Sequence, residues 1–297
     1  MSRIAYVNGR YLPHAHATVH IEDRGYQLGD GVYEVCEVLG GRLVDERLHL
    51  GRLARSLREL SIAWPLTPAA LGVVLREVVR RNRVADGLVY IQVTRGVASR
   101  DHAFPTIAVA PALVVTARSL SRRARDERAR TGVSVFTVPD TRWARVDIKT
   151  IGLLPNVLAK QRAREEGAFE AWFVDKEGYI TEGASTNAWI VASDGALITR
   201  PADTGILRGI TRTALVATAG RSGVRLDERP FTLQEALAAR EAFLTSATAA
   251  VTPIVKINGQ NVGDGRPGPV ASSLRAALAS AVEIAPAWST PAALPDI

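Results

Sequence analysis

The sequence predicts a mixed α and β fold in two domains, and three observations lead to this. Alternating apolar runs bounded by Gly-containing turns, typical of strands, occur in both halves of the chain. Runs with apolar residues every three or four positions, typical of helices, stand between them. A charged stretch at residues 119–128 has no apolar stripe, so we interpret it as a connection between domains at 1–118 and 129–284.

Turn signals and periodicity define the elements of the first domain. The Asn8-Gly9 pair predicts a hairpin, because Asn-Gly suits the tight turn between two antiparallel strands. Leucines at helical spacing predict the first helix, and strict alternation predicts the first long strand. The expected elements are a hairpin over 4–11, a strand over 32–39, helices over 48–62 and 68–83, and strands over 88–96 and 107–117.

The second domain repeats the same signals in a different order. Its expected strands lie at 133–138, 171–174, 179–181, 187–192 and 196–199, and its expected helices at 153–166, 211–221 and 232–239. A segment rich in Pro and Ala, 285–297, is expected to be a loosely held tail.

Composition excludes several classes of protein. The one cysteine, Cys36, cannot form a disulfide framework, and His14, His16 and His20 lie in an irregular segment without clustered acids, so we expect no metal. The first 13 residues lack the apolar core of a secretory signal, and the longest mostly apolar run, 107–117, is too short to span a bilayer. We therefore expect a cytoplasmic protein with no membrane partner.

The net charge of +7 leaves a basic nucleic-acid-binding protein as an alternative. However, the arginines are scattered over both halves of the chain, and aromatic residues make up only 6% of it. Only four of the 37 basic residues are lysines: Lys149, Lys160, Lys176 and Lys256. Because arginine cannot replace a nucleophilic amine, any chemistry that needs one is confined to these four residues.

Lys149 differs from the other three lysines in its surroundings. The others lie on a polar helical face or beside turns, whereas Lys149 is flanked by Ile148, Ile151 and Leu153. Apolar surroundings favour the neutral amine that a Schiff-base lysine needs. A lysine that extends to solvent from a strand end is the alternative from local context alone.

Four other segments have weaker signals. Gly209-Ile210-Thr211 opens an apolar helix, whose free N–H groups suit a phosphate, although a capped helix has the same pattern. The hydroxyl-rich run 245–248 is a second possible phosphate cradle or a polar loop. Glu182 follows a strand among small residues, as either a turn residue or a partner for a ring nitrogen. Finally, the loop pair Arg100 and His102 suits a carboxylate, or is an incidental basic pair.

Taken together and in order, these segments resemble the class IV (fold type IV) pyridoxal-phosphate-dependent aminotransferases. The matching segments are EDRGYQLGDGVYEV at 22–35, RLARS at 52–56, VTRGVASRDHAFP at 93–105, DIKTIGLLPNVLAKQ at 147–161, TEGASTN at 181–187, ILRGITR at 206–212 and LTSATAAVTP at 244–253. Within the family, the GDGVYEV block and the Arg100/His102 loop resemble the branch that acts on D-amino acids.

The resemblance implies an α+β fold and one cofactor, pyridoxal 5'-phosphate. The smaller N-terminal domain would be an α/β sandwich, and the larger C-terminal domain would be barrel-like with helices. Lys149 would hold the cofactor as a Schiff base and move the proton between the substrate α-carbon and the cofactor. Glu182 would pair with the ring nitrogen and keep the ring an electron sink. The other implied cofactor contacts are Arg52, Leu207, Gly209, Ile210, Thr211, Ser246, Ala247 and Thr248.

The resemblance also implies the substrates and the assembly. Tyr33, Arg100 and His102 would bind the carboxylate of a D-amino acid or a 2-oxo acid, and Tyr90 would line the pocket. Arg100 and His102 would come from the other subunit of a homodimer. The alternatives on this fold are an (R)-amine transaminase, a branched-chain aminotransferase and an aminodeoxychorismate lyase. Trp189, Ala184 and Ala247 depart from the residues usual in the family, which bears on substrate preference and cofactor affinity.

Overall fold

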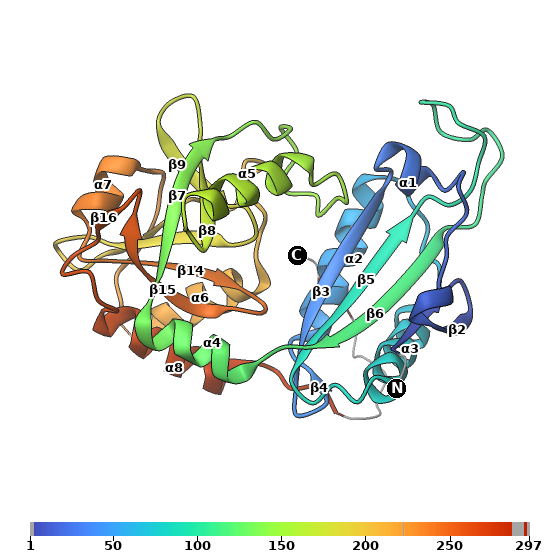
Figure 1. The fold of residues 1–297 in the computed structure, drawn as a ribbon, viewed down its shortest axis with the longest axis horizontal. Helices are drawn as coiled ribbons and strands as arrows, with labels where there is room; N and C mark the ends of the chain where they lie inside the picture. The colour runs from blue at the N-terminus through green and yellow to red at the C-terminus, as the bar shows by residue number, and fades with distance from the viewer. Residues whose placement is uncertain (1–2, 222, 287–293, 296–297) are drawn as a thin grey trace. The chain divides into compact units, whose positions relative to one another are not determined.

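A computed structural model of the chain describes residues 3–221, 223–286 and 294–295, and these residues separate into two compact units (Figure 1). Unit 1 runs from the N-terminus to Ser121 and also takes in Ile148–Gly152 and the C-terminal segment from Glu283. Unit 2 comprises Arg122–Asp147 and Leu153–Val282. Each unit contains one sheet and its own helices, so the expected α+β fold is confirmed.

This division differs from the expected boundaries of 1–118 and 129–284 in two places. Residues 148–152 join unit 1, because their backbone pairs with the strand that begins at Gly31. Residues from Glu283 also join unit 1, where Asp45 and Glu283 are linked by hydrogen bonds and Ala285 donates to Leu43. Local sequence could not indicate that either segment belongs to unit 1, because both assignments depend on pairing between distant segments.

Unit 1 is built on a six-stranded antiparallel sheet in the order β2-β1-β6-β5-β3-β4. The expected hairpin is confirmed: Asn8 and Gly9 both have positive φ, as its tight turn requires. The elements are β1 (Ile4–Val7), β2 (Arg10–Pro13), a 3-10 turn (His14–His16), α1 (Arg24–Leu28), β3 (Gly31–Leu39), β4 (Arg42–Leu43), α2 (Glu46–Glu59), α3 (Pro68–Arg81), β5 (Gly87–Thr94) and β6 (Ala112–Ser119).

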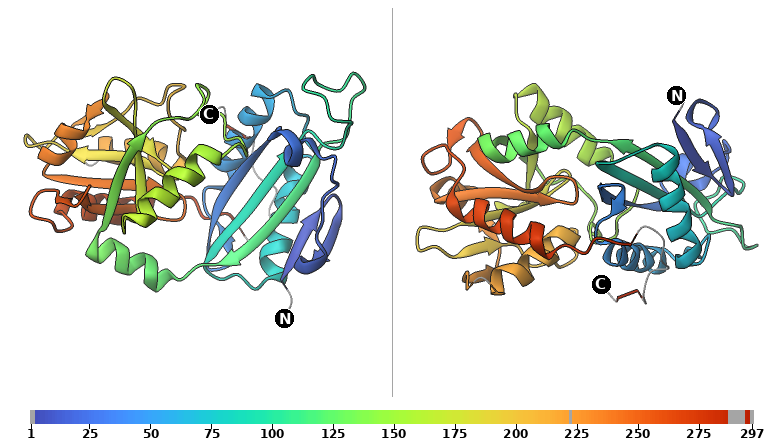
Figure 2. Two further views of the ribbon diagram at one scale, coloured as in Figure 1. Left: turned by 45° about the horizontal axis from the view of Figure 1, so that its top comes forward. Right: turned by 90° about the horizontal axis from the view of Figure 1, so that it is seen from below.

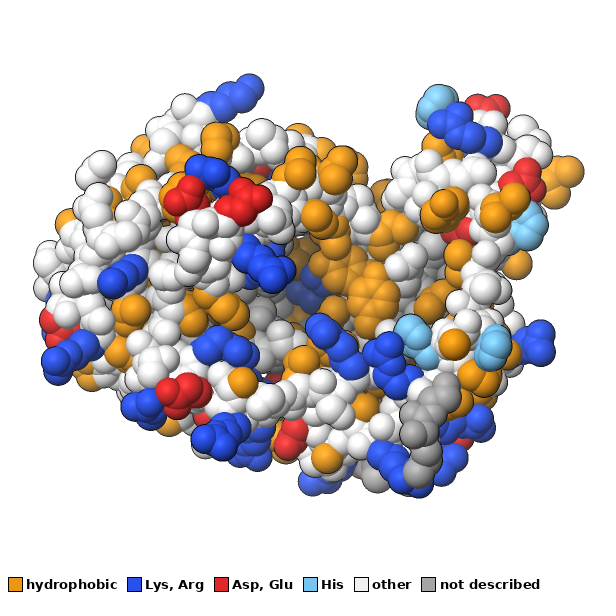
Figure 3. Space-filling model, in the orientation of Figure 1, with side chains coloured by type: hydrophobic (Ala, Val, Ile, Leu, Met, Phe, Trp, Pro, Cys, Tyr) orange, Lys and Arg blue, Asp and Glu red, His pale blue; other side chains and the backbone are white. Residues whose placement is uncertain are grey.

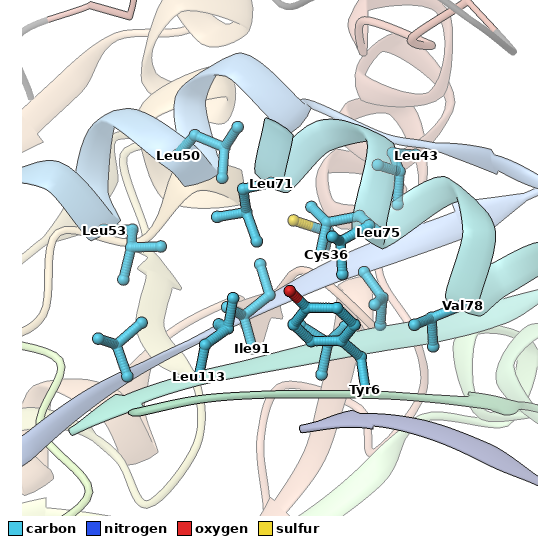
Figure 4. Packing of buried hydrophobic residues seen from close by; sticks show 14 of the residues in the cluster. Tyr6, Cys36, Leu43, Leu50, Leu53, Leu71, Leu75, Val78, Ile91 and Leu113 are labelled. Carbon is cyan, nitrogen blue, oxygen red and sulfur yellow. The ribbon is translucent and has the colours of Figure 1, made fainter. Parts of the chain in front are cut away.

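Helices α2 and α3 cover one face of this sheet, and the core of unit 1 lies between them and the strands (Figure 4). Leu50 and Leu53 of α2 and Leu71 of α3 pack against Cys36 and Ile91 of the strands. Successive side chains of a strand point to opposite faces, so the neighbours of these core residues project from the other face. Tyr33 and Tyr90, which alternate with core residues of β3 and β5, therefore share that second face.

Unit 2 contains a longer sheet in the order β12-β11-β10-β14-β15-β7-β8-β9-β13, with β16 paired to β15. Helices α6 and α8 pack together over β14 and β15 (Figure 2). The elements are α4 (Arg122–Thr131), β7 (Val133–Pro139), α5 (Leu154–Glu165), β8 (Glu170–Val174), β9 (Tyr179–Gly183), β10 (Asn187–Val191), β11 (Leu197–Thr199), α6 (Ile210–Arg221), β12 (Leu226–Glu228), β13 (Phe231–Thr232), α7 (Leu233–Ala238), β14 (Glu241–Ser246), β15 (Ala250–Ile257), β16 (Gln260–Asn261) and α8 (Pro269–Ala281).

Two expected elements differ from the structure. The stretch 119–128, expected as a connection, mostly forms helix α4, because its Arg and Ala residues favour helix and pairs such as Arg130 with Glu127 support it. The strand expected over 107–117 begins only at Ala112. Pro111 precedes it and cannot donate to a ladder, and Ile107 is 80% exposed.

The C-terminal part of the chain is described only in places. The expected tail, 285–297, lies outside the described residues except for 285, 286, 294 and 295. Of these, Ala285 is buried and Leu294 packs against the core of unit 1. Among the described helices, none is long and apolar enough to cross a membrane.

Candidate functional site

Lys149 lies in a short extended segment that pairs with β3 of unit 1. Its carbonyl oxygen accepts from the backbone N–H of Tyr33 at 3.0 Å, and Ile151 N–H donates to the Gly31 carbonyl at 3.1 Å. The Lys149 N–H donates to the hydroxyl of Ser56, 3.4 Å away, on α2. Two hydrogen bonds therefore hold the Lys149 main chain and a third holds the nearby Ile151, while the Lys149 side chain is half-buried.

The side-chain nitrogen of Lys149 lies against an aromatic pair. Its Nζ is 4.2 Å from the centre of the Tyr33 ring, which stacks on Tyr90 with centroids 5.6 Å apart. The Tyr90 hydroxyl donates to Gln92 Oε1 at 2.7 Å. Burial, and then the neighbouring Tyr33, raise the pKa of Tyr90 to about 12, so this phenol is a neutral hydrogen-bond donor at neutral pH. The structure thus brings together three of the residues singled out in the sequence.

Arg52, expected to contact phosphate, lies on α2 in a buried ion pair. Its Nε and Nη2 donate to the two carboxylate oxygens of Glu34 at 2.6 and 2.9 Å, and His49 Nδ1 lies 2.9 Å from Glu34 Oε2. Burial opposes ionisation, but the Arg52 charge and the hydrogen bonds from His49 and Arg52 hold the pKa of Glu34 well below its usual range. Sequence reasoning missed Glu34, although a carboxylate in the core register of a strand is a usable signal.

Arg100 and His102 lie on the loop between β5 and β6, and both side chains are exposed. The loop is anchored between these two residues, because Arg24 Nη1 donates to the Asp101 carbonyl at 2.7 Å. Among the described contacts of the single chain, none joins Arg100 or His102 to Tyr33. The expected grouping of these three residues therefore stays a prediction.

Glu182, at the end of β9 in unit 2, is buried and bound by several donors. Arg142 Nη1 donates to Oε1 at 2.5 Å, the Leu207 N–H donates to Oε1 at 3.1 Å, and Asn187 Nδ2 donates to Oε2 at 2.9 Å. A carboxylate has about four lone-pair positions, so this geometry is that of a fixed acceptor. Arg142 was missed in the sequence because it is one arginine among many, in an irregular loop.

Asn187 connects three parts of unit 2 that the sequence singled out separately. Besides binding Glu182, its Nδ2 donates to the Leu207 carbonyl at 2.9 Å, and on the sheet Asn187 pairs with Thr245 of β14. A Cβ placed on Gly209 would lie 2.1 Å from Asn187 Oδ1. The loop before α6 therefore lies directly on this asparagine, and a side chain at residue 209 would have to displace the Asn187 amide.

The first turn of α6 and the turn after β14 are the two candidate phosphate cradles. Helix α6 begins at Ile210, and the first N–H groups of a helix, here those of Ile210 and Thr211, have no partner inside it. Such groups bind anions with the help of the helix dipole. In the other turn, residues 246–249, the Ser246 hydroxyl accepts from the Ala249 N–H at 3.2 Å, which holds Ala247 and Thr248 in a tight bend.

Two of the residues that differ from those usual in the family, Trp189 and Ala184, are buried in unit 2. Trp189 is fully buried in β10, stacks on Phe243, and donates from Nε1 to the Thr245 hydroxyl at 2.9 Å. Ala184 is also buried, and its carbonyl accepts from Asn156 of α5. Trp189 is therefore a core residue of unit 2 whose ring nitrogen is satisfied.

Basic side chains do not gather into one patch on the face shown in Figure 3, where they are separated by acidic and apolar groups. The charged helix α4 has its own acids, with Arg122 near Asp126 and Arg130 bonded to Glu127. His14, His16 and His20 are exposed. Among the described residues, no group of three His, Cys, Asp or Glu side chains is placed to hold a metal ion.

Comparison with known sequences finds one family and relatives that are named aminotransferases. The family described as "Amino-transferase class IV" matches residues 31–257. A protein named D-alanine aminotransferase from Bacillus licheniformis is 40% identical over 275 residues, covering 93% of this chain and 95% of the relative. A protein of the same name from Staphylococcus haemolyticus is also 40% identical, covering 91% and 94%.

Solved structures with a similar fold include two branched-chain amino acid aminotransferases. That of Escherichia coli superposes with a TM-score of 0.84 at 25% identity, covering 93% of both chains. The second, from T.th., was solved with pyridoxamine 5'-phosphate; it has a TM-score of 0.84 at 26% identity and covers 94% of both chains. These similarities extend over nearly the whole chain, and both units are included.

Proposed function

The chain belongs to the class IV aminotransferases, and we propose that it transfers the amino group of D-amino acids, such as D-alanine or D-glutamate, to 2-oxo acids such as 2-oxoglutarate. The relatives named D-alanine aminotransferase, at 40% identity over more than nine-tenths of the chain, support this substrate class. The observation that carries the proposal is Lys149. An amine is held on the sheet of unit 1 beside the Tyr33 ring, in a chain that has almost no other lysines.

The residues present fit pyridoxal 5'-phosphate. Gly209, where a Cβ would collide with Asn187, leaves bare backbone at the start of α6, as close approach of a phosphate requires. We propose that Ile210, Thr211 and the bend at residues 246–248 bind the phosphate together with Arg52, and that Leu207 packs under the ring. When bound, the cofactor supplies a conjugated ring that accepts the electrons released at the substrate α-carbon.

Two side chains would perform the proton chemistry. Lys149 Nζ would anchor the cofactor. It would then accept the proton from the substrate α-carbon and deliver it to the cofactor. Glu182, fixed by Asn187 and Leu207, would keep the ring nitrogen protonated. A buried carboxylate held by several donors suits this second role because its orientation is fixed and water does not screen it.

Substrate binding would use a carboxylate clamp. We propose that Tyr33, Arg100 and His102 bind the carboxylate, with Tyr90 lining the pocket and the two basic residues supplied by the partner in a cytoplasmic homodimer. Exposed apolar side chains near the basic loop support an interface there: Phe104 and Ile107 are 58% and 80% exposed in the single chain. Burying such residues against a second copy would favour association.

The test is a half-reaction. The holoenzyme mixed with D-alanine should show a shift of the bound-cofactor absorbance and release pyruvate, and added 2-oxoglutarate should restore the first spectrum. Ping-pong kinetics should follow, since both substrates use one pocket. A protein that binds no cofactor, or whose spectrum is unchanged by D-alanine and by L-amino acids, would contradict the proposal.

A second candidate is branched-chain aminotransferase activity, which the TM-scores of 0.84 to two such enzymes favour. The same assay separates the two functions, because L-valine or L-leucine would replace D-alanine as the better donor. The 40% identity to the D-alanine enzymes, against 25–26% to these structures, favours the D-amino acid.

A further inference from the structure

Arg142 joins two acids of unit 2, the buried Glu182 and the half-buried Asp140. It lies in the irregular segment after β7, and its side chain is only 5% exposed. Its Nη1 donates to Glu182 at 2.5 Å, while its Nε and Nη2 donate to Asp140 at 3.0 and 2.7 Å. The guanidinium therefore binds Asp140 through two of its nitrogens and Glu182 through the third.

The two hydrogen bonds to Asp140 fix the direction in which the third nitrogen of Arg142 points toward Glu182. A guanidinium is planar, so two bonds to one carboxylate set its plane and the line of its remaining N–H groups. Asp140 is itself held, because the Thr181 hydroxyl donates to its Oδ2 at 2.8 Å. The Phe173 ring centre lies 4.3 Å from the Arg142 guanidinium carbon and limits its movement.

Arg142 also brings a full positive charge to Glu182, whereas Asn187 and the Leu207 N–H bring neutral dipoles. Burial opposes the charged forms, but the hydrogen bonds and opposite charges of Asp140 and Glu182 outweigh it and raise the pKa of Arg142. Similarly, burial is outweighed at Asp140, whose pKa is lowered chiefly by the hydrogen bond and charge of Arg142. Asp140 and Arg142 are thus held ionised as a pair, and the charge of Arg142 faces Glu182.

We propose that Arg142 is a positioning residue for catalysis: it keeps the Glu182 carboxylate ionised and in one orientation, so that the ring nitrogen of the cofactor stays protonated. This inference rests on the proposed function. Without the guanidinium, the buried Glu182 loses the positive charge that favours its ionised form and can lower its energy by taking up a proton. A protonated Glu182 no longer stabilises a positive charge on the ring.

The experiment compares Arg142→Gln with Arg142→Lys and with Arg145→Gln as the matched control. Arg145 lies in the same segment and bonds to Asp147, but its side chain is 41% exposed. The resting absorbance spectrum of each holoenzyme is recorded without substrate. The absorbance maximum of R142Q should shift in the same direction as that of Glu182→Gln. The spectrum of R145Q should be the same as that of the wild type.

The rate of the D-alanine half-reaction gives the second readout. R142Q should be slower than the wild type by about 100-fold, the loss typical of a displaced catalytic group, and R142K, which keeps the charge but loses the two-nitrogen contact with Asp140, should recover part of the rate. Because Arg142 acts through Glu182, adding R142Q to E182Q should cause little further loss in a double-mutant cycle. Additive losses, or spectra of R142Q and R142K that both match the wild type, would overturn the inference.

Two checks keep the result interpretable. Circular dichroism and cofactor titration of the apoprotein establish whether each variant folds and binds the cofactor. If R142Q does not fold, the comparison of R142K with the wild type decides. An R142K protein with the wild-type spectrum and the wild-type rate then counts against the inference. Failure of the proposed function is a different result. In that case the wild-type spectrum itself does not respond to D-alanine, whatever occupies residue 142.

Discussion

The carbonyl oxygen of Lys149 accepts a hydrogen bond from the backbone N–H of Tyr33, and Nζ of the same lysine lies 4.2 Å from the centre of the Tyr33 ring. One residue of β3 thus fixes both the main chain and the side chain of the candidate nucleophile. Since Lys149 stands between two stretches that belong to unit 2, this pairing is what assigns it to unit 1.

Replacing Lys149 by arginine should abolish transamination, because a guanidinium is always charged and cannot attack a carbonyl. We expect kcat to fall by about three orders of magnitude or more. Borohydride reduction of the wild-type holoenzyme, followed by peptide mapping, should place the cofactor on Lys149. The exposed Lys176→Arg is the control and should behave as the wild type; label on any other lysine would contradict the assignment.

Gly209→Ala should damage the loop before α6, because its Cβ would lie 2.1 Å from Asn187 Oδ1. The expected cost is about 1–3 kcal/mol of unfolding free energy, as for other overpacked positions, together with weaker cofactor binding. Urea denaturation and cofactor titration measure the two effects. Gly220→Ala, on the same helix with nothing within 4 Å of its Cβ, should be neutral or slightly stabilising. Equal behaviour of the two variants would refute this account.

Glu34→Gln should destabilise unit 1 strongly, since it removes the negative charge from the buried ion pair with Arg52. Removing one partner of a buried pair typically costs about 3–5 kcal/mol. The variant should also bind cofactor more weakly if Arg52 contacts the phosphate. Glu127→Gln is the control, because the Glu127 side chain is 55% exposed and its partner Arg130 is a surface residue. Chemical denaturation of the apoproteins distinguishes them.

The same ion pair predicts a pH dependence of stability. The pKa of Glu34 lies well below its usual range in the folded protein, against about 4.3 when unfolded. A lowered pKa contributes stability that is complete above the unfolded value and is lost as the pH falls below it. The unfolding free energy of the wild type should therefore fall more steeply than that of Glu34→Gln between about pH 5 and pH 3. Parallel curves would show that Glu34 is not the group responsible.

Supply of Arg100 by a partner subunit predicts complementation. Lys149→Ala and Arg100→Ala should each be inactive, yet a mixture that has exchanged subunits should recover up to about one quarter of wild-type activity, because half of the dimers are hybrids with one intact site. Size-exclusion chromatography before and after exchange confirms the dimer. Absence of recovery despite proven exchange would place Arg100 in the same chain as its Lys149.

Local sequence was sufficient where the structure depends on short-range physics. The Asn8-Gly9 turn, the leucine spacing of α2 and the alternation of β3 each predicted the element that the structure contains. Helix α4 was missed because it is stabilised by charge pairs and propensity rather than by an apolar stripe. The late start of β6 reflects prolines in the preceding loop, which periodicity does not register.

The sequence by itself determined the chemical inventory: four lysines, of which one is surrounded by apolar residues, and an ordered set of segments that resembles one family. Only the tertiary structure decided which groups act together. The Arg142–Glu182 contact, the Glu34–Arg52 pair and the position of Lys149 on β3 all join residues far apart in the chain. Such contacts depend on strand pairing and on which face of a sheet or helix each side chain occupies, and no local pattern encodes the pairing of two distant segments.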